Sequence, residues 1–305
     1  MGTSISVLIG PPADPAALPA GAMVIAAQAM LVRFEHVLSR FIEDSELSRL
    51  NRDPREEVPA SALLRRAVRA GLWAAERTGG LVDPTVLPAV RAAGYTASRA
   101  GLASVSLTDA LAAAPLRLPG GPRANPVWTS IVVLDDVAAI RREPGVLIDL
   151  GGVGKGLATD LLADRLSGYE RFVIDCGGDI RVGGLRPDRW PVEVAVQHPL
   201  TGASVDSFRI DDGAAATSGL NARLWQRKDG RFAHHLIDPA TGEPAWTGLI
   251  AASAKAPTGV QAETLAKAAL LSGPAGASRF LAEHGGLVVH DNGEIRSIPA
   301  VGAAP

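Results

Sequence analysis

The sequence predicts an α+β fold in which mixed and antiparallel sheets are flanked by helices. Alternating apolar and polar residues, the pattern of half-buried strands, occur near both ends and in the middle of the chain. Segments with helical periodicity lie between them. No shift in composition divides the 305 residues, so we expect one domain spanning 1–305.

The first part of the chain is expected to hold one strand and two amphipathic helices. Residues 3–9 alternate as a strand does, and 22–41 place apolar side chains on one helical face. A second helix is predicted over 60–78, where two glycines follow as a stop signal. Residues 95–126 are rich in Ala, Ser and Pro and are expected to form a variable loop region within the domain.

The remainder is expected to alternate strands and turns, with helices between them. Strands are expected at 130–136, 145–150 and 190–199, and a strand that enters a glycine turn is expected at 171–184. Strand and turn pieces are expected at 214–219, 232–244 and 248–257, and a closing hairpin at 286–298. Helices are predicted at 157–167, 259–273 and 277–286.

Composition favours a globular cytoplasmic enzyme. The hydrophobic fraction is 47%, and the net charge of −2 gives no electrostatic footprint for nucleic acid. A single cysteine, Cys176, excludes an internal disulfide and any cysteine-based metal site. The chain opens without a signal-peptide pattern. Its longest apolar run, "AGAMVIAAQAML", is about a dozen residues and too short to span a bilayer.

The stretch "LIDLGGVGKGLATD" (147–160) sets Lys155 among glycines where a strand is expected to become a helix. Backbone amides at a helix start attract anions, and glycine permits close backbone approach. Neither the Walker A spacing nor G-x-G-x-x-G is met. The stretch therefore favours an anion-facing strand–loop–helix of another kind; the alternative is an ordinary glycine turn.

Two turns share an acid placed just before glycines, "DLGG" with Asp149 and "DCGGD". Carboxylates repel a bare phosphate, but they bind the hydrogens of a ribose or an adenine, or a metal that bridges to phosphate. Asp149 beside Lys155 thus suggests a nucleotide, with the lysine on phosphate and the acid on a neutral donor. The alternative is that these acids only cap their turns.

Two further residue pairs, one of histidines and one of opposite charges, have both a functional and a structural interpretation. In "HHLIDPATG", strand alternation turns His234 and His235 to opposite faces, so only one of them reaches a given cleft. A neutral imidazole suits proton removal near pH 7, although a lone histidine is more often structural. Glu263 and Lys267 share a helix face, either as a surface ion pair or as part of a cleft.

Taken in order, seven segments resemble the ApbE family, the FAD:protein FMN transferases. They are MGTSISVLI (1–9), FIEDSELSRLN (41–51), GGLVDPTVLP (79–88), LIDLGGVGKGLATD (147–160), VIDCGGDIRVGG (173–184), ATSG (216–219) and HLIDPATGEP (235–244). Each segment alone is weak, but the ordered set covers nearly the whole chain and is highly specific.

The resemblance implies an ApbE-like, T-fold-like architecture and magnesium-dependent transfer of FMN. FMN would pass from FAD to a Thr or Ser hydroxyl in the flavinylation motif of an acceptor protein, with release of AMP. Lys155 would neutralise phosphate, and His235 would act on the attacking hydroxyl. The positions that the resemblance assigns to FAD binding are Met1, Phe41, Asp83, Pro84, Thr85, Asp149, Lys155, Thr217, Ser218 and Ile237.

The chain departs from the family at the metal positions, which correspond to the carbonyl of Gly152 and to Glu263 and Lys267. The family has an aspartate and a threonine or serine at the latter two. A protonated lysine is no metal ligand, so we expect its ammonium to stand near the place of the cation. Two alternatives to an active transferase follow: a homologue that binds FAD without transferring FMN, and an FAD pyrophosphatase.

Overall fold

The computed structural model describes residues 2–99, 101–102, 105–186 and 190–302. A seven-stranded sheet forms its centre, in the order β1-β5-β6-β9-β12-β13-β14, and every pair of neighbouring strands is antiparallel. Its strands are β1 (Ile5–Ile9), β5 (Phe172–Cys176), β6 (Asp179–Gly183), β9 (Gly213–Gly219), β12 (Leu249–Ala256), β13 (Gly286–His290) and β14 (Ile295–Ile298). The sequence-predicted α+β class is confirmed.

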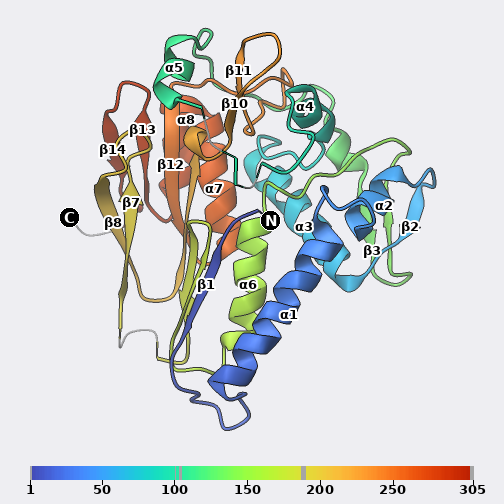
Figure 1. The fold of residues 1–305 in the computed structure, drawn as a ribbon, viewed down its shortest axis with the longest axis vertical. Coiled ribbons are helices and arrows are strands. Elements are labelled where there is room, and N and C mark those ends of the chain that lie inside the picture. The colour runs from blue at the N-terminus through green and yellow to red at the C-terminus, as the bar shows by residue number, and fades with distance from the viewer. Residues whose placement is uncertain (1, 100, 103–104, 187–189, 303–305) are drawn as a thin grey trace.

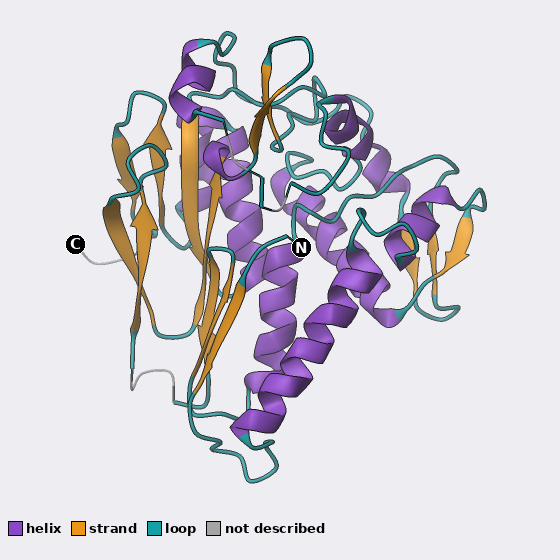
Figure 2. Cartoon of the chain, in the orientation of Figure 1, coloured by secondary structure: helices purple, strands orange, loops and turns teal. Residues whose placement is uncertain are grey.

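Helices cover one face of this sheet, with α6 and α7 against it and α1 outside them (Figure 1, Figure 2). The helices are α1 (Ala20–Leu38), α2 (Glu46–Arg52), α3 (Ala62–Thr78), α4 (Leu87–Ala92), α5 (Leu107–Ala112), α6 (Gly154–Leu166), α7 (Gly259–Leu271) and α8 (Gly273–Leu281). The smaller sheets pair β2 (Glu57–Pro59) and β3 (Val132–Leu134) with β4 (Ala139–Arg141), β7 (Val192–Gln197) with β8 (Ser204–Ile210), and β10 (Leu224–Gln226) with β11 (Phe232–His234).

Small side chains bring α7 close to the sheet. Strand β9 has the sequence GAAATSG, and the facing residues of α7 are largely alanines that are fully buried. Side chains of this size let a helix backbone approach a strand without leaving voids. The helix start is fixed by Thr258, whose hydroxyl accepts from the Gln261 N–H. The residues of α7 that face the glycine loop are therefore held on a rigid support.

Cap residues set the limits of α3, which ends at the two glycines as the sequence predicts. Ser61 accepts a hydrogen bond from the Leu64 N–H, and the Glu46 carboxylate accepts from the N–H and hydroxyl of Ser61. At the other end Gly79 adopts a left-handed φ of 62°, which glycine reaches without steric cost. The loop that follows α3 therefore leaves in a fixed direction, toward the cavity described below.

Two sequence expectations are wrong in detail. Residues 145–150 form no strand: the Asn51 side chain bonds both the N–H and the C=O of Ile148, and Pro84 accepts from the Asp149 N–H. These partners replace a strand ladder. The variable loop region at 95–126 contains helix α5, capped by the Ser106 hydroxyl on the Asp109 N–H.

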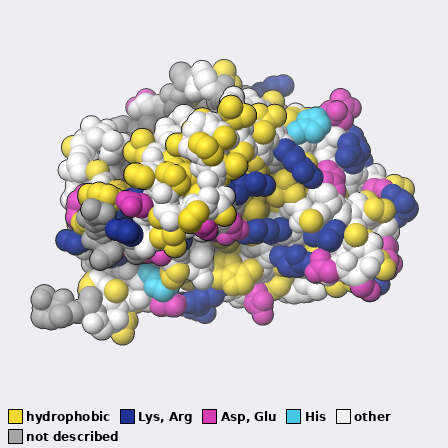
Figure 3. All heavy atoms as spheres, turned by 90° about the horizontal axis from the view of Figure 1, so that it is seen from below, with side chains coloured by type: hydrophobic (Ala, Val, Ile, Leu, Met, Phe, Trp, Pro, Cys, Tyr) yellow, Lys and Arg dark blue, Asp and Glu magenta, His cyan; other side chains and the backbone are white. Residues whose placement is uncertain are grey.

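Helix α1 continues beyond the apolar run seen in the sequence. Among the described residues it is the one helix that is long and apolar enough to cross a membrane, by length and composition alone. It packs on α2, α3 and α6 and buries Met23, Ala27, Phe34 and Leu38. The outward side of α1 exposes Ile25 and other apolar residues. Seen from below, the surface of the protein carries a cluster of hydrophobic side chains (Figure 3).

Candidate functional site

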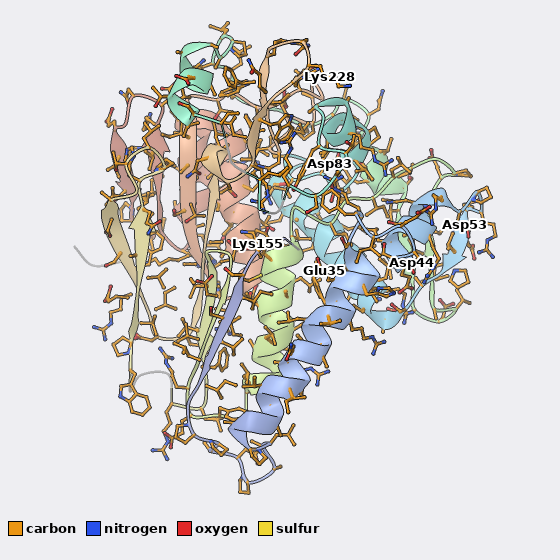
Figure 4. All side chains as sticks on the ribbon, viewed as in Figure 1. Glu35, Asp44, Asp53, Asp83, Lys155 and Lys228 are labelled. Atoms are coloured by element: carbon orange, nitrogen blue, oxygen red, sulfur yellow. The ribbon has the colours of Figure 1, made fainter. Side chains whose placement is uncertain are left out.

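A cavity of about 310 Å³ lies where several segments meet. Its walls come from the end of α1, the turn after α3, the glycine loop before α6, the end of β9 with the segment after β11, and one face of α7. These segments are far apart in sequence, and the sheet with its covering helices brings them together. Figure 4 shows Lys155 at the N-terminal end of α6, below Asp83.

The glycine loop places Lys155 in the first turn of α6. Val153 precedes the helix, and its carbonyl accepts from the Leu157 N–H. Lys155 Nζ forms an ion pair with Asp179 Oδ1 at 2.8 Å. Asp179 begins β6, directly after the second glycine turn, so both turns meet at this pair. The two acid–glycine turns thus converge in the structure, and Gly151 and Gly177 line the same cavity.

Burial sets the electrostatics of this ion pair. It raises the pKa of Asp179 to about 7, against the opposing charge of Lys155. The pKa of Lys155 is also raised: burial alone would lower it, but the negative charges of Asp179 and Glu263 outweigh that effect. Lys155 therefore stays cationic near neutral pH, while its partner carboxyl is poised to take up a proton.

A second ammonium group lies beside the glycine loop. Lys267 Nζ donates to the carbonyl oxygen of Gly152 at 2.5 Å and lies 3.5 Å from Glu263 Oε1. The other carboxylate oxygen, Glu263 Oε2, accepts from the Gly156 N–H at 2.9 Å. Glu263 and Lys267 are thus no exposed surface pair, because their side chains are 4% and 12% exposed and both line the cavity.

The turn after α3 supplies a carboxylate with a free oxygen. Asp83 Oδ1 accepts from the N–H of Thr85 at 2.6 Å and from its hydroxyl at 2.5 Å. Asp83 Oδ2 is buried and has no hydrogen-bond partner among the described residues. Asp83 and Pro84 line the cavity, whereas Thr85 is buried behind them and does not. Thr85 therefore orients Asp83 rather than facing a ligand.

An aromatic wall stands at the mouth of the cavity. The Arg40 guanidinium lies 4.1 Å from the Phe41 ring centroid and 4.6 Å from that of Tyr95, and it donates to the Tyr95 carbonyl. Arg40 Nε also pairs with Asp149 Oδ2 at 3.2 Å, and Asp149 Oδ1 accepts from the Gly151 N–H. The Asp149 carboxylate thus caps its turn and anchors Arg40, while it also lines the cavity.

The two histidines lie on opposite sides, as strand alternation predicts. His235 lines the cavity, and its Nδ1 lies 3.4 Å from the Arg223 carbonyl. Because a carbonyl only accepts, Nδ1 carries the proton and Nε2 is left as an acceptor. His234 is fully buried, with its ring edge-on to Trp246 at 4.8 Å. Burial lowers the pKa of both histidines to about 3, so both are neutral at pH 7.

The structure brings most of the sequence-predicted residues to this one cavity. Those that line it are Phe41, Asp83, Pro84, Asp149, Gly152, Lys155, Thr217, Ser218, His235, Ile237, Glu263 and Lys267. Thr85 does not, and Met1 lies outside the described residues. Sequence reasoning missed Arg40, Tyr95 and Arg223 and gave Asp179 no role of its own. Only the Arg-Phe pair at the end of a predicted helix offered a signal for them.

These features define the kind of ligand that the cavity accepts. Two ammonium groups on its inner side favour an anionic centre, and the aromatic wall favours a planar ring. The unpartnered Asp83 oxygen favours a neutral N–H or O–H donor. Together they describe a site for a nucleotide-like molecule that carries a phosphate group and a flat ring system.

Comparison with known proteins agrees with this description. Residues 1–289 match the sequence profile of the ApbE family. The chain therefore belongs to the ApbE family. It is 27% identical over 264 residues to the FAD:protein FMN transferase of Klebsiella pneumoniae (strain 342), and the match covers 85% of this chain and 73% of the relative. The Escherichia coli (strain K12) protein of the same name is 25% identical over 265 residues, with the same coverage.

Solved structures show the same fold. The ApbE protein of Thermotoga maritima superposes with a TM-score of 0.78 at 25% identity, covering 97% of this chain and 94% of that one. The flavin transferase ApbE of Vibrio cholerae gives a TM-score of 0.71 at 23% identity, with 97% of each chain covered. The expected ApbE-like architecture is thereby confirmed.

Proposed function

We propose that this chain is an FAD:protein FMN transferase, which moves FMN from FAD to a Thr or Ser hydroxyl of an acceptor protein and releases AMP. One observation carries the proposal: Lys155 and His235, from distant segments, line one cavity beside an aromatic wall. The names of the Klebsiella pneumoniae and Escherichia coli relatives support it.

In this proposal FAD lies along the cavity with its pyrophosphate near Lys155. The ammonium group counters the negative charge that accumulates on the phosphate oxygens as the pyrophosphate is cleaved. The Asp83 oxygen that has no partner accepts from an N–H or O–H of the flavin or adenine half. The planar ring packs against Phe41 at the mouth, where the side chain is exposed.

The transfer step breaks one P–O bond and forms another. The acceptor hydroxyl oxygen bonds to the phosphorus of the FMN half, and the bond from that phosphorus to the bridging oxygen breaks. AMP leaves with the bridging oxygen. His235, neutral at pH 7, takes the hydroxyl proton on Nε2 while its Nδ1–H is held by the Arg223 carbonyl.

Intact-mass spectrometry of a candidate acceptor tests the proposal. The flavin-free acceptor is incubated with the chain and FAD, and an acceptor whose hydroxyl residue is changed to Ala serves as the control. The proposal expects one FMN added to the first acceptor, none to the second, and AMP in equal amount. Free FMN with AMP would identify a pyrophosphatase, and unchanged bound FAD would identify a binding protein without transfer; either result contradicts the proposal.

A further inference from the structure

The ApbE resemblance implies a magnesium ion at Gly152, Glu263 and Lys267, and the residues present do not fit one. Magnesium needs six oxygen ligands in near-octahedral geometry at roughly 2.0–2.1 Å. The Gly152 carbonyl oxygen already accepts from Lys267 Nζ at 2.5 Å, and Glu263 Oε2 is bonded to the Gly156 N–H. Among the described residues, no three His, Cys, Asp or Glu side chains gather to hold a metal ion.

Repulsion between the Lys267 ammonium and a metal cation also disfavours metal binding at this site. A cation on the Gly152 oxygen would stand beside the Lys267 ammonium, which shares that oxygen. The ammonium group is held in position, since Glu263 Oε1 lies 3.5 Å away and the Lys267 side chain is only 12% exposed. Two positive charges that share one carbonyl oxygen in a partly buried site repel each other strongly. The lysine therefore excludes the metal rather than merely failing to bind it.

The same ammonium group is suited to replace the metal. It lines the cavity on the side of the glycine loop, which also carries Lys155. An ammonium has three N–H donors, and the Gly152 carbonyl occupies one of them. A donor thus remains for a phosphate oxygen, and the helix α7 holds it at a fixed place in the site.

We propose that the Lys267 ammonium is the resident cation of this site, so that the chain binds the FAD pyrophosphate without a divalent metal. The inference rests on the proposed function, because it concerns the same cavity and the same ligand. By the ApbE resemblance, it would distinguish this chain from family members that carry an aspartate and a threonine or serine at these positions. Because the Lys267 ammonium is covalently part of α7, it does not dissociate as a metal ion does, and a chelator cannot remove it.

Calorimetric titration with FAD tests this inference, with each protein measured in EDTA and again in excess magnesium. For the natural chain we expect the same dissociation constant within about twofold in both buffers. The Lys267→Thr variant exposes the Glu263 carboxylate to the pyrophosphate, so its affinity in EDTA should fall by about tenfold or more. Magnesium should restore part of that loss. The double change Glu263→Asp with Lys267→Thr should bind FAD in a clearly magnesium-dependent way.

Lys228→Thr is the matched control. This lysine is exposed in the turn between β10 and β11 and does not line the cavity, so the variant removes the same charge elsewhere (Figure 4). It should bind FAD as the natural chain does. Thermal unfolding of every variant checks that the protein remains folded.

The outcomes separate the inference from the proposed function. A natural chain that binds FAD many-fold more tightly with magnesium than in EDTA overturns the inference and leaves the proposed function standing. A Lys267→Thr variant that binds FAD unchanged in EDTA also overturns it. If the natural chain binds no FAD in either buffer, the proposed function fails, and this inference fails with it.

Discussion

Gly156 in α6 and Gly259 in α7 are in direct backbone contact. A Cβ atom placed on Gly156 would come within 2.3 Å of the Gly259 carbonyl oxygen, and one placed on Gly259 would come within 2.6 Å of the Gly156 oxygen. Asp160 reinforces the contact, because its carboxylate accepts from the N–H groups of Gly259 and Val260. This crossing sets the distance between the glycine loop and the α7 face that carries Glu263 and Lys267.

Gly156→Ala should separate the two helices and destabilise the protein by roughly 1–3 kcal/mol, the usual range for overpacking a close contact. Gly154→Ala is the control, since a Cβ there meets nothing within 4 Å. Urea unfolding measures both variants. Equal stability of the two variants would mean that the close crossing is not required.

His235→Ala should reduce the rate of FMN transfer by about 10²–10⁴-fold, the range for loss of a general base, and change FAD affinity only a few-fold. His234→Ala should leave transfer by the folded protein unchanged, but cost about 1–3 kcal/mol of stability, because its ring is fully buried against Trp246. Transfer rates and unfolding curves distinguish these effects. Equal loss of transfer in both variants would contradict the assignment of the cavity face.

Acid should destabilise the protein partly through His234. Its pKa is about 3 in the folded protein because burial disfavours the charged ring, whereas the unfolded value is about 6.5. The unfolded chain therefore binds the proton first, and the stability present above pH 6.5 is lost as the pH falls toward 3. Between pH 7 and pH 5, protonation of His234 in the unfolded chain lowers the free energy of unfolding by about 2 kcal/mol. Between pH 7 and pH 5, the free energy of unfolding of His234→Gln should therefore fall by about 2 kcal/mol less than that of the natural protein. Urea unfolding at the two pH values measures this difference.

Asp83→Asn should weaken FAD binding by about tenfold or more. The change replaces the charged carboxylate by a neutral amide, so the atom at the position of Oδ2 is either an NH2 group, which donates, or a carbonyl oxygen, which accepts less strongly. Asp44→Asn is a suitable control, since Asp44 is exposed and does not line the cavity (Figure 4). A fluorescence titration with FAD compares the two. No difference between them would show that Asp83 makes no contact with the ligand.

The sequence predicted those parts of the site that depend on local patterns. The glycine loop with Lys155 and the alternation of His234 and His235 follow from short-range geometry, and α7 corresponds to the expected helix over 259–273, which a glycine ends. The position of Arg40 was not predictable, because it depends on Tyr95, which comes from a loop distant in sequence. Residues 145–150 look like a strand, yet the Asn51 side chain takes the place of a strand partner. Such tertiary partners leave no local sequence signal.

The most direct measurement is a crystal structure of the FAD complex grown in the presence of a chelator. We expect FAD in the cavity, with pyrophosphate oxygens within hydrogen-bond distance of Nζ of both Lys155 and Lys267. The flavin ring would lie against Phe41, and the phosphorus of the FMN half would be open to a hydroxyl held by His235. FAD bound at another surface, or its pyrophosphate turned away from both lysines, would show that this cavity does not bind FAD in the proposed way.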